Sequence, residues 1–301
     1  MRTLCLGEAL VDMICVRRVG SLAEADAFVP HFGGATANVT VAAARAAAGP
    51  EPVTALAGGT GDDAFGPWLH DRLADAGVDL RWFQLMRGQH TPVAFVAIDA
   101  AGDATYQIYG EAISLALEAV ADRLPDAVEA CEGLFFGSNT LVGERERALT
   151  RAARDQALAQ GKPVLFDPNL RLHRWPTVAR AAAEANACVE GAALVRCNRD
   201  EAEILTGEAD PDAAAGALLA AGAQSVVVSL GAEGAILRGG ARADTPGVPA
   251  EVVSTVGAGD CLTGVLVAAL TESGYHPEAL ARALPAAVAA AARTCEQWGA
   301  V

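Results

Sequence analysis

Short apolar runs alternate with longer alanine-rich stretches of mixed polarity over most of the chain, which predicts strands that alternate with helices. From Gly133 onward this alternation is regular. Strands are expected at residues 134–136, 163–167, 193–195 and 225–230, and helices at residues 144–159, 178–189, 200–205, 212–221 and 277–298. Such a sequence favours an α/β fold with a mainly parallel sheet that is covered by helices on both faces.

The first half of the chain breaks this rhythm. Residues 3–7, 9–16 and 53–57 predict strands, and helices are expected after Gly34 and after Gly66. Residues 78–86, 92–99 and 103–109 then predict three successive strands without a long helix between them. Together with the run after Asp12, they indicate a small sheet that projects from the main body and could serve as a lid.

Polar clusters follow several of the predicted strands of the second half. They lie at residues 167–171, 196–201, 229–234 and 257–260. In parallel sheets, ligands bind at the carboxyl ends of the strands. We therefore expect the four clusters to share one site.

The turn Gly257-Ala258-Gly259-Asp260 precedes an apolar run of helical composition, and the β-type run 251–253 precedes the turn. Free N–H groups at a helix start bind anions, and small residues let a phosphate approach the backbone. An aspartate in the first helical turn stays ionised and can take a proton from an attacking hydroxyl. The alternative is an ordinary glycine turn in which Asp260 caps the helix.

Two further polar residues have alternative interpretations. Asp12 interrupts an apolar run, so it either faces solvent on an edge strand, which the cost of burying charge favours, or points into a site. Asn38 lies about one turn into the helix that follows Gly33-Gly34. Its amide suits a sugar hydroxyl, although an incidental asparagine near a helix start is the simpler interpretation.

One stretch supports a different class of protein. Gly59-x-Gly61-x-x-Ala64, followed by Asp79, matches the fingerprint of dinucleotide-binding oxidoreductases. Against this interpretation, the stretch is not in the first βα unit of the chain. The Asp62-Asp63 pair would also place negative charge beside a pyrophosphate.

Composition excludes several classes. The 301 residues are 52% hydrophobic and 20% charged, as expected of a globular chain, and the formal net charge of −15 argues against binding to nucleic acid or an anionic membrane. No apolar run reaches the roughly 18 residues of a membrane helix, and residues 1–6 do not resemble a signal peptide. Seven scattered cysteines without a CxxC pair indicate reduced thiols, so we expect a cytoplasmic protein.

Two residue types limit the chemistry further. Lys162 is the only lysine, and no GxxxxGK[ST] motif is present, so the site is not a P-loop. Cys261 beside Asp260 would be a reactive thiol only if a base lay close to it, which we regard as the less favoured interpretation.

The motifs taken together resemble the ribokinase-like, or PfkB, family of sugar kinases. The turn at residues 254–260 is similar to the family's DTxGAGD signature, and the other similar motifs, in chain order, are Gly33-Gly34-x-x-x-Asn38, Gly58-Gly59-x-Gly61-x-Asp63-x-x-Gly66, the run 166–171 with Trp175, and Asn198-x-x-Glu201. The resemblance covers essentially the whole chain. It implies one kinase domain over residues 1–301, a ribokinase-like three-layer α/β/α sandwich with a mainly parallel central sheet, and a small β-sheet lid built from about 10–32 and 88–111.

The resemblance also implies roles for individual residues. Asp260 would be the catalytic base, and Gly257, Ala258 and Gly259 would form the anion hole. The implied sugar-binding residues are Asp12, Gly33, Gly34, Asn38, Asn169 and Arg171, of which Arg171 could instead meet ATP phosphates. The implied ATP-binding residues are Asn198, Ser229, Gly231, Gly234, Thr255, Gly257 and Gly259. Glu201 would hold Mg²⁺ through water.

Within the family the motifs look most like those of fructokinases. Alternatives are a 2-keto-3-deoxygluconate kinase, another PfkB sugar or nucleoside kinase, and a non-catalytic protein that binds sugar or nucleotide on the same fold. Ser254 stands where the family usually has the aspartate that helps to bind a monovalent cation, so K⁺ activation is in question. The family resemblance is also compatible with a homodimer formed through the lid.

Overall fold

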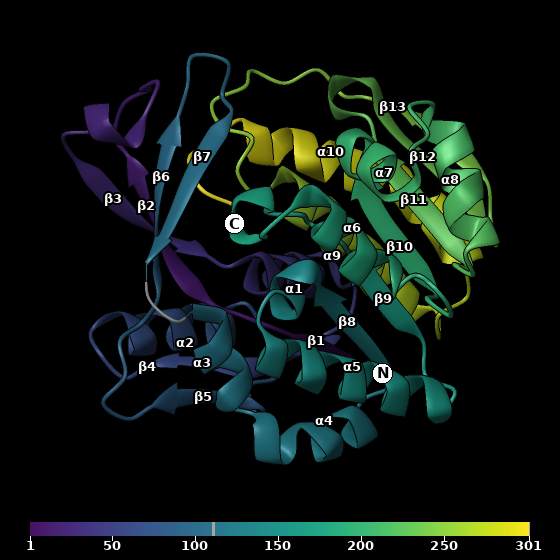
Figure 1. Ribbon diagram of the computed structural model, residues 1–301, viewed down its shortest axis with the longest axis horizontal. Coiled ribbons are helices and arrows are strands. Elements are labelled where there is room, and N and C mark those ends of the chain that lie inside the picture. Colours follow the sequence, from purple (N-terminus) through teal and green to yellow (C-terminus); the bar gives the residue numbers. More distant parts are fainter. Residues whose placement is uncertain (110–111, 301) are drawn as a thin grey trace.

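A computed structural model describes residues 1–109 and 112–300 and shows a three-layer α/β architecture (Figure 1). The large sheet of the described residues has nine strands in the order β13-β12-β11-β10-β9-β8-β1-β4-β5. All neighbours are parallel except the pairs β11–β12 and β12–β13. The strands are β1 (Thr3–Leu6), β4 (Thr54–Gly61), β5 (Phe83–Met86), β8 (Gly133–Gly137), β9 (Val164–Asp167), β10 (Leu194–Asn198), β11 (Ser225–Ser229), β12 (Gly234–Gly239) and β13 (Ala243–Pro246).

Helices cover both faces of the large sheet. On one face lie α1 (Ala35–Ala46), α2 (Phe65–Asp75), α9 (Ala258–Glu272) and α10 (Glu278–Cys295). On the other lie α3 (Ala112–Glu118), α4 (Leu124–Ala130), α5 (Glu144–Ala159), α6 (Val178–Asn186), α7 (Arg199–Thr206) and α8 (Pro211–Ala220). Short 3-10 turns complete the chain: η1 (Leu22–Glu24), η2 (Ala121–Arg123), η3 (Ser138–Leu141), η4 (Leu172–Arg174) and η5 (Gly231–Glu233). Among the helices described, none combines the length and apolarity that crossing a membrane requires.

The alternation of side chains along each strand builds two cores. Leu4 and Leu6 of β1 pack into the core beneath α3 to α8, whereas Cys5 between them packs beneath α1, α2, α9 and α10. Phe135 and Phe136 of β8 divide in the same way. The central strands are therefore apolar on both faces, as a sheet between two helical layers requires.

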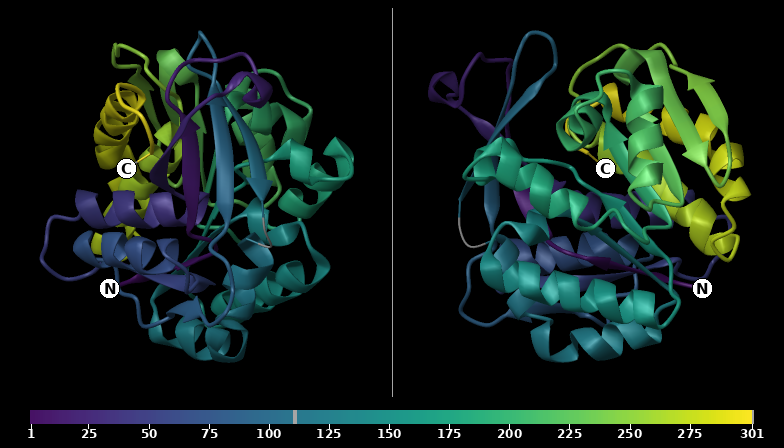
Figure 2. Two further views of the ribbon diagram at one scale, coloured as in Figure 1. Left: turned by 90° about the vertical axis from the view of Figure 1, so that its left-hand side faces the viewer. Right: turned by 45° about the vertical axis from the view of Figure 1, so that its right-hand side comes forward.

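A second sheet, the small sheet, projects beside these layers (Figures 1 and 2). Its strands have the order β3-β2-β6-β7 and are β2 (Leu10–Cys15), β3 (Phe28–Gly33), β6 (Val93–Ile98) and β7 (Ala104–Tyr109). β2 and β6 are parallel, and the two outer pairs are antiparallel. Residues 110–111, at the end of the segment 88–111 predicted for the lid, lie outside the described residues.

Much of the element prediction is confirmed. The helix expected at residues 144–159 is α5 with the same bounds, and the expected alternation of strands and helices after Gly133 is present. The prediction of a small sheet is also confirmed. Two features were missed: the short helices α3 and α4, and the antiparallel edge formed by β12 and β13.

The assignment of residues 78–86 to the small sheet was wrong. Only Phe83–Met86 forms a strand, β5, and it pairs in parallel with β4 at the edge of the large sheet. Phe83 packs into the core beneath α2. In the chain, α2 connects β4 to β5, which are parallel neighbours in the large sheet. Burial of this ring, which local sequence does not reveal, selects the partner strand.

The glycines after residue 57 also differ from expectation. The strand was predicted to end at residue 57, but β4 continues through these glycines to Gly61. At Gly58 an added Cβ would overlap the carbonyl oxygen of Gly7, so the glycine allows β1 and β4 to approach closely. Since these glycines lie inside a strand and not in a turn before a helix, the dinucleotide fingerprint is not formed.

The segment before the glycine turn is not a strand. Residues 251–253 were expected to be β-type, but the Val253 N–H donates to the carbonyl oxygen of Cys295 at the end of α10. α10 itself is shorter than the predicted helix 277–298. The end of α10 therefore supports the segment 251–253, which leads to the Gly257 turn.

Candidate functional site

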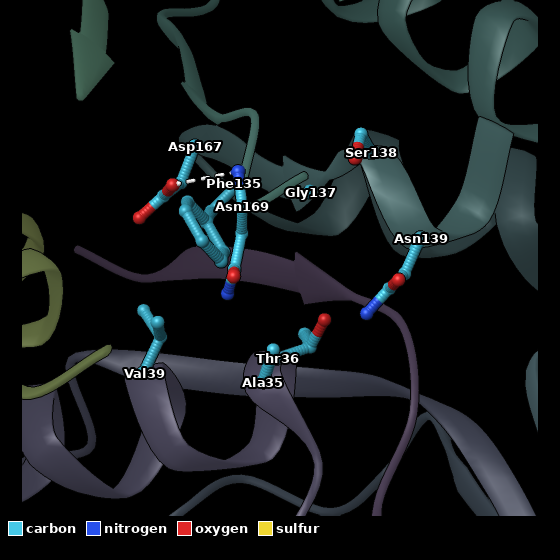
Figure 3. A pocket seen from close by; sticks show the side chains of 9 residues that line it. All are labelled: Ala35, Thr36, Val39, Phe135, Gly137, Ser138, Asn139, Asp167 and Asn169. Carbon is cyan, nitrogen blue, oxygen red and sulfur yellow. Dashed lines mark hydrogen bonds between the residues drawn. The ribbon is translucent and has the colours of Figure 1, made fainter. Parts of the chain in front are cut away.

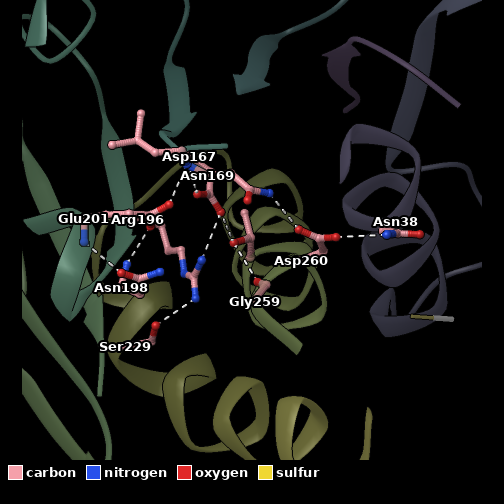
Figure 4. Close-up of polar contacts among 11 residues, drawn as sticks. Asn38, Asp167, Asn169, Arg196, Asn198, Glu201, Ser229, Gly259 and Asp260 are labelled. Atoms are coloured by element: carbon pink, nitrogen blue, oxygen red, sulfur yellow. Dashed lines mark hydrogen bonds and ion pairs between the residues drawn. The ribbon is translucent and has the colours of Figure 1, made fainter. Parts of the chain in front are cut away.

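The site is organised around Asp260, which lies in the first turn of α9. Its side chain is 6% exposed and is held by two amides from distant segments. Asn38 Nδ2 donates to Asp260 Oδ2 at 2.9 Å, and Asn169 Nδ2 donates to Asp260 Oδ1 at 3.0 Å (Figure 4). The carboxylate is therefore fixed in orientation by α1 on one side and by the loop after β9 on the other.

The backbone of Asn169 contributes to this arrangement. Its φ of 38° lies in the left-handed region, which asparagine adopts more readily than most residues. Its N–H donates to Asp167 Oδ1 at 3.1 Å, which stabilises the turn after β9. The local conformation thereby directs the Asn169 amide toward Asp260.

Burial raises the pKa of Asp260 to about 6, and the positive charge of Arg171 opposes that rise. The carboxylate is consequently ionised for the most part at neutral pH, while its pKa lies only about one unit below that pH. A general base is most effective when its pKa lies near the working pH. The expected role of Asp260 as a base thus has a physical basis in its burial.

Asp260 faces a pocket between the small sheet and the large one. Six of the predicted residues line it: Asp12, Gly34, Asn38, Arg171, Gly257 and Asp260. Asp12 is 4% exposed and comes from β2, an inner strand of the small sheet, so the favoured interpretation of a solvent-facing edge residue was wrong. Burial raises the pKa of Asp12 to about 8, and the nearby Asp260 carboxylate adds to the rise.

The raised pKa of Asp12 predicts a pH-dependent stability. The folded protein holds this proton more tightly than the unfolded chain, so the free energy of unfolding falls as pH rises from about 4 toward about 8. Asp12→Asn removes the ionisation. We expect its thermal unfolding midpoint, relative to wild type, to be higher at pH 8 than at pH 5 by on the order of 2 °C or more.

The exposed Asp75 at the end of α2 offers a control for this measurement. Asp75→Asn makes the same replacement at an exposed position outside the pocket, so it shows what the substitution itself does to the unfolding midpoint at the two pH values. Equal effects of Asp12→Asn at pH 5 and pH 8 would contradict the assignment of a protonated Asp12.

Several lining residues had not been predicted as site residues. They include the polar residues Glu8, Tyr106 and Asn139. Glu8 accepts hydrogen bonds from the Ala35 N–H at 3.1 Å and from Asn139 Nδ2 at 3.3 Å, so it connects the start of α1 to the turn after β8. A charged residue directly after a buried strand was a usable signal for Glu8, whereas only tertiary structure reveals Tyr106.

A smaller pocket adjoins this one (Figure 3). Thr36, Ser138, Asn139, Asp167 and Asn169 contribute polar groups to its lining. The Ser138 hydroxyl is buried and has no hydrogen-bond partner among the described residues. The pocket is connected to Asp260 through Asn169, whose amide holds the carboxylate.

The start of α9 has the features of an anion site. In the described chain no side chain caps α9, and its N-cap residue Gly257 has a φ of 76°. The first amides of this 15-residue helix consequently point away from it without a side-chain acceptor. Ala258 and Gly259 form the first positions of the helix beside Asp260.

An ion pair lies behind this turn. Arg196 Nη1 donates to Asp167 Oδ2 at 3.3 Å, and Thr263 Oγ1 donates to the same oxygen at 2.6 Å. Arg196 Nη2 donates to Ser229 Oγ at 2.8 Å at the end of β11 (Figure 4). The polar clusters predicted to share a site are thus connected by hydrogen bonds.

The remaining residues predicted to bind nucleotide lie at the same edge. Asn198 and Ser229 are neighbours in register at the carboxyl ends of β10 and β11. Gly231 begins the turn η5, which follows the end of β11, and Gly234 begins β12 after that turn. Gly33, by contrast, lies beside Asp12 in the small sheet and does not line the pocket.

Glu201 lies close to this edge, with both oxygens bonded to the backbone. Glu201 Oε1 accepts from the Leu170 N–H at 2.6 Å, and Oε2 accepts from the Asn198 N–H at 2.9 Å. Asn198 Oδ1 in turn accepts from the Glu201 N–H, which completes a capping box at the start of α7. Burial and the charge of Asp167 raise the pKa of Glu201.

Thr255 contacts the small sheet. Its N–H and its Oγ1 both donate to the carbonyl oxygen of Gly102, at 2.9 and 3.1 Å, in the turn between β6 and β7. Arg18 spans the same junction, because its guanidinium donates to Ala100 O at 3.1 Å and to Val252 O at 2.8 Å. The small sheet is thereby attached to the segment that leads into the Gly257 turn.

The thiol next to Asp260 has no activated character. Burial raises the pKa of Cys261, which keeps the thiol protonated. The interpretation of Cys261 as a reactive nucleophile is therefore not supported.

The comparisons with known proteins agree with one another. A family model described as pfkB family carbohydrate kinase matches residues 2–301. Fructokinase-1 of Oryza sativa subsp. japonica is 31% identical over 300 residues, which cover 98% of this chain and 92% of the rice protein.

Two solved structures are similar to the whole chain. The fructokinase from Xylella fastidiosa with bound ATP superposes with a TM-score of 0.81 at 26% identity and covers 99% of this chain and 93% of its own. The fructokinase from Vibrio cholerae O395 in its fructose, ADP and calcium ion bound form has a TM-score of 0.81 at 27% identity and covers 99% and 94%. These matches confirm the ribokinase-like fold. The chain belongs to the PfkB family of carbohydrate kinases, and within it this sugar kinase is fructokinase-like.

Proposed function

We propose that this chain transfers the γ-phosphate of ATP to a hydroxyl group of fructose. The observation that carries the proposal is the buried Asp260, oriented by Asn38 and Asn169 at the start of α9 and facing a pocket that also contains Asp12. The fructose and the nucleotides bound in the related fructokinases support the same pair of substrates.

In this mechanism Asp260 takes the proton from the sugar hydroxyl as it attacks. Asn38 and Asn169 keep the carboxylate in one orientation, so the base does not have to be reoriented in the transition state. The amides at Gly257, Ala258 and Gly259 would stabilise the charge on the transferring group from the positive end of the α9 dipole. The Ala258 N–H donates to the Thr255 carbonyl oxygen at 3.3 Å and would exchange this bond for one to the transferring group. Asp12 and Gly34 bind the sugar from the small-sheet side.

The donor set agrees with a magnesium ion that is carried mainly by the nucleotide. Mg²⁺ keeps several waters and uses one or two carboxylates together with substrate phosphates. Glu201 would hold such an ion through water, since each of its oxygens accepts one backbone N–H and retains a second lone pair. Asn198, Ser229, Gly231 and Gly234 would bind the nucleotide at the ends of β10 and β11.

The decisive experiment measures ADP release from ATP and Mg²⁺ with a panel of sugars, in the presence and absence of K⁺. We expect fructose to give the highest kcat/KM. We also expect K⁺ to change the rate by no more than about twofold, because Ser254 brings no charge and its Oγ already accepts the Val256 N–H at 3.1 Å. Absence of activity with every sugar would refute the proposal.

One observation favours a second candidate substrate, 2-keto-3-deoxygluconate. Arg171 lies in the pocket over the Tyr106 ring, 5.2 Å from its centroid, and within the described chain its side chain forms no hydrogen bond or ion pair. A carboxylate on the substrate would complete a bidentate pair with this guanidinium. Including the acid in the panel separates the two candidates.

We further propose that the small sheet is the lid of a single domain spanning residues 1–301 and that two copies associate through it. The outer face of the small sheet carries Phe28, Phe95 and Tyr109, whose rings pack edge to face at 4.9 and 5.6 Å. Tyr109 is 58% exposed, so this apolar face is open to a partner. Sedimentation analysis measures the oligomeric state.

The seven free cysteine thiols support a cytoplasmic location.

A further inference from the structure

Arg196 is a buried cation at the centre of the large sheet. It lies in the middle of β10 and is only 5% exposed, while its strand neighbours Val195 and Cys197 are apolar and fully buried. It does not line the pocket that contains Asp12 and Asp260. A charged residue in this position therefore needs an explanation that direct contact with the sugar does not provide.

The guanidinium contacts three parts of the site at once. Besides its bonds to Asp167 and Ser229, it packs against Gly259, where an added Cβ would lie 2.9 Å from Nη1 and 3.1 Å from Nη2. Arg196 Nε is buried and has no hydrogen-bond partner among the described residues. The planar guanidinium is thus packed between the start of α9 and the end of β11.

Asp167 extends these contacts to the base. One of its oxygens binds Arg196 and Thr263, and the other accepts the N–H of Asn169, whose side chain holds Asp260 (Figure 4). A chain of hydrogen bonds consequently runs from Ser229 through Arg196 and Asp167 to Asp260.

This arrangement is costly for stability alone. The Arg196 charge is removed from water and lies near the positive end of α9, and a buried ion pair is often no more stabilising than apolar residues of similar size. What the pair offers is a fixed geometry, because a planar guanidinium can hold an acceptor on each side.

We propose that Arg196 is a positioning residue that sets the Ser229 loop and the Gly259 turn at a fixed distance from Asp260. The inference rests on the proposed kinase function and deepens it. According to this inference, one arginine outside the sugar pocket aligns the nucleotide phosphates with the base.

The test compares Arg196→Met, which removes the charge and the planar donors, with Arg196→Lys, which keeps the charge. Arg238→Met serves as the matched control, since Arg238 is a 6% exposed arginine of the same sheet that pairs with Asp212 and Asp244, none of which belongs to the site. Steady-state kinetics with ATP and sugar varied separately, kcat–pH profiles and calorimetric sugar binding are measured for all variants.

For Arg196→Met we expect kcat/KM for ATP to fall about 10- to 100-fold, as for a lost hydrogen bond to a charged group, while sugar affinity stays within about twofold. The acid limb of the kcat–pH profile should move to higher pH, because the charge of Asp167 then lies uncompensated beside Asp260. Arg196→Lys should restore the pH profile but not the full affinity for ATP. The charged and titratable groups around Asp260 are Arg171, Asp167, Arg196, Asp12, Tyr106 and Cys261.

Wild-type kinetics and pH profile in Arg196→Met, or changes that Arg238→Met reproduces, would overturn the proposal. If Arg196→Met does not fold, Arg196→Lys decides, because it keeps the charge and removes the planar pair of donors that joins Asp167 to Ser229. Its kcat/KM for ATP should then fall with an unchanged pH profile, and an unchanged kcat/KM would overturn the inference.

The two hypotheses fail in different ways. If the wild-type protein phosphorylates no sugar, the proposed function is wrong, yet nucleotide affinity measured by thermal shift still tests Arg196. If the protein phosphorylates a sugar but substitutions at residue 196 leave its kinetics unchanged, only the positioning role is rejected.

Discussion

Asp260→Asn is expected to lower kcat for sugar phosphorylation at least about 10²-fold, the contribution of a general base, with ATP and sugar affinity close to wild type. The substitution removes the proton acceptor and keeps the shape of the side chain. Asn38 Oδ1 has no hydrogen-bond partner in the described chain, so rotation of the Asn38 amide would provide an acceptor for the amide group introduced at position 260. The variant should therefore fold.

The control for this measurement is Asp126→Asn. Asp126 is an exposed aspartate in the first turn of α4, on the opposite layer of the protein. It has the same helical position as Asp260 without a pocket, and its replacement should leave kcat unchanged. Near-normal sugar-dependent ADP release by Asp260→Asn would rule out the assignment of the base.

Gly257→Ala is expected to produce the second large loss, about 10²- to 10³-fold in kcat, as when a donor of an oxyanion hole is displaced. Gly257 has a φ of 76°, and an added Cβ would overlap Ala300. The backbone must therefore shift where it forms the anion site. Sugar affinity, measured by calorimetry, should persist because Asp12 and Asn38 lie on other elements.

Gly274 at the other end of α9 is a matched control. Its φ of 71° is similar, but the nearest atom to an added Cβ is Met1 Cε at 3.6 Å, an ordinary contact. Gly274→Ala carries the same left-handed strain, about 1–2 kcal/mol, without the collision. It should lower stability and preserve kcat. An equal loss of kcat in the two variants would show that strain alone lowers activity, and wild-type kcat in Gly257→Ala would contradict a role for the position of the turn.

The parts of the fold that sequence predicted well depend on local patterns. The bounds of α5 follow from a helical periodicity between a glycine and a change of polarity, and no distant contact alters them. The partner of β5 and the hairpin of β12 and β13 depend on pairing between strands, for which one sequence has no local signal.

The site shows the same division. The glycine turn and Asp260 form a contiguous motif, and the structure brings them together with Asn38 and Asn169. The burial of Asp12 depends on the position of β2 inside the small sheet, and Glu201 is turned toward backbone amides of two loops. Such properties belong to the environment of a side chain, which its neighbours in sequence do not define.

The bonds from Thr255 to Gly102 have a consequence for how this protein tolerates change. The tip of a β-hairpin is ordinarily a surface where inserted residues and peptide epitopes are accommodated at little cost. Here the tip at residues 99–103 carries the oxygen that anchors the approach to Asp260, so an insertion would displace that anchor. A tag or a fused domain should therefore be placed in another loop, because this hairpin tip is hydrogen-bonded to the segment that positions Asp260.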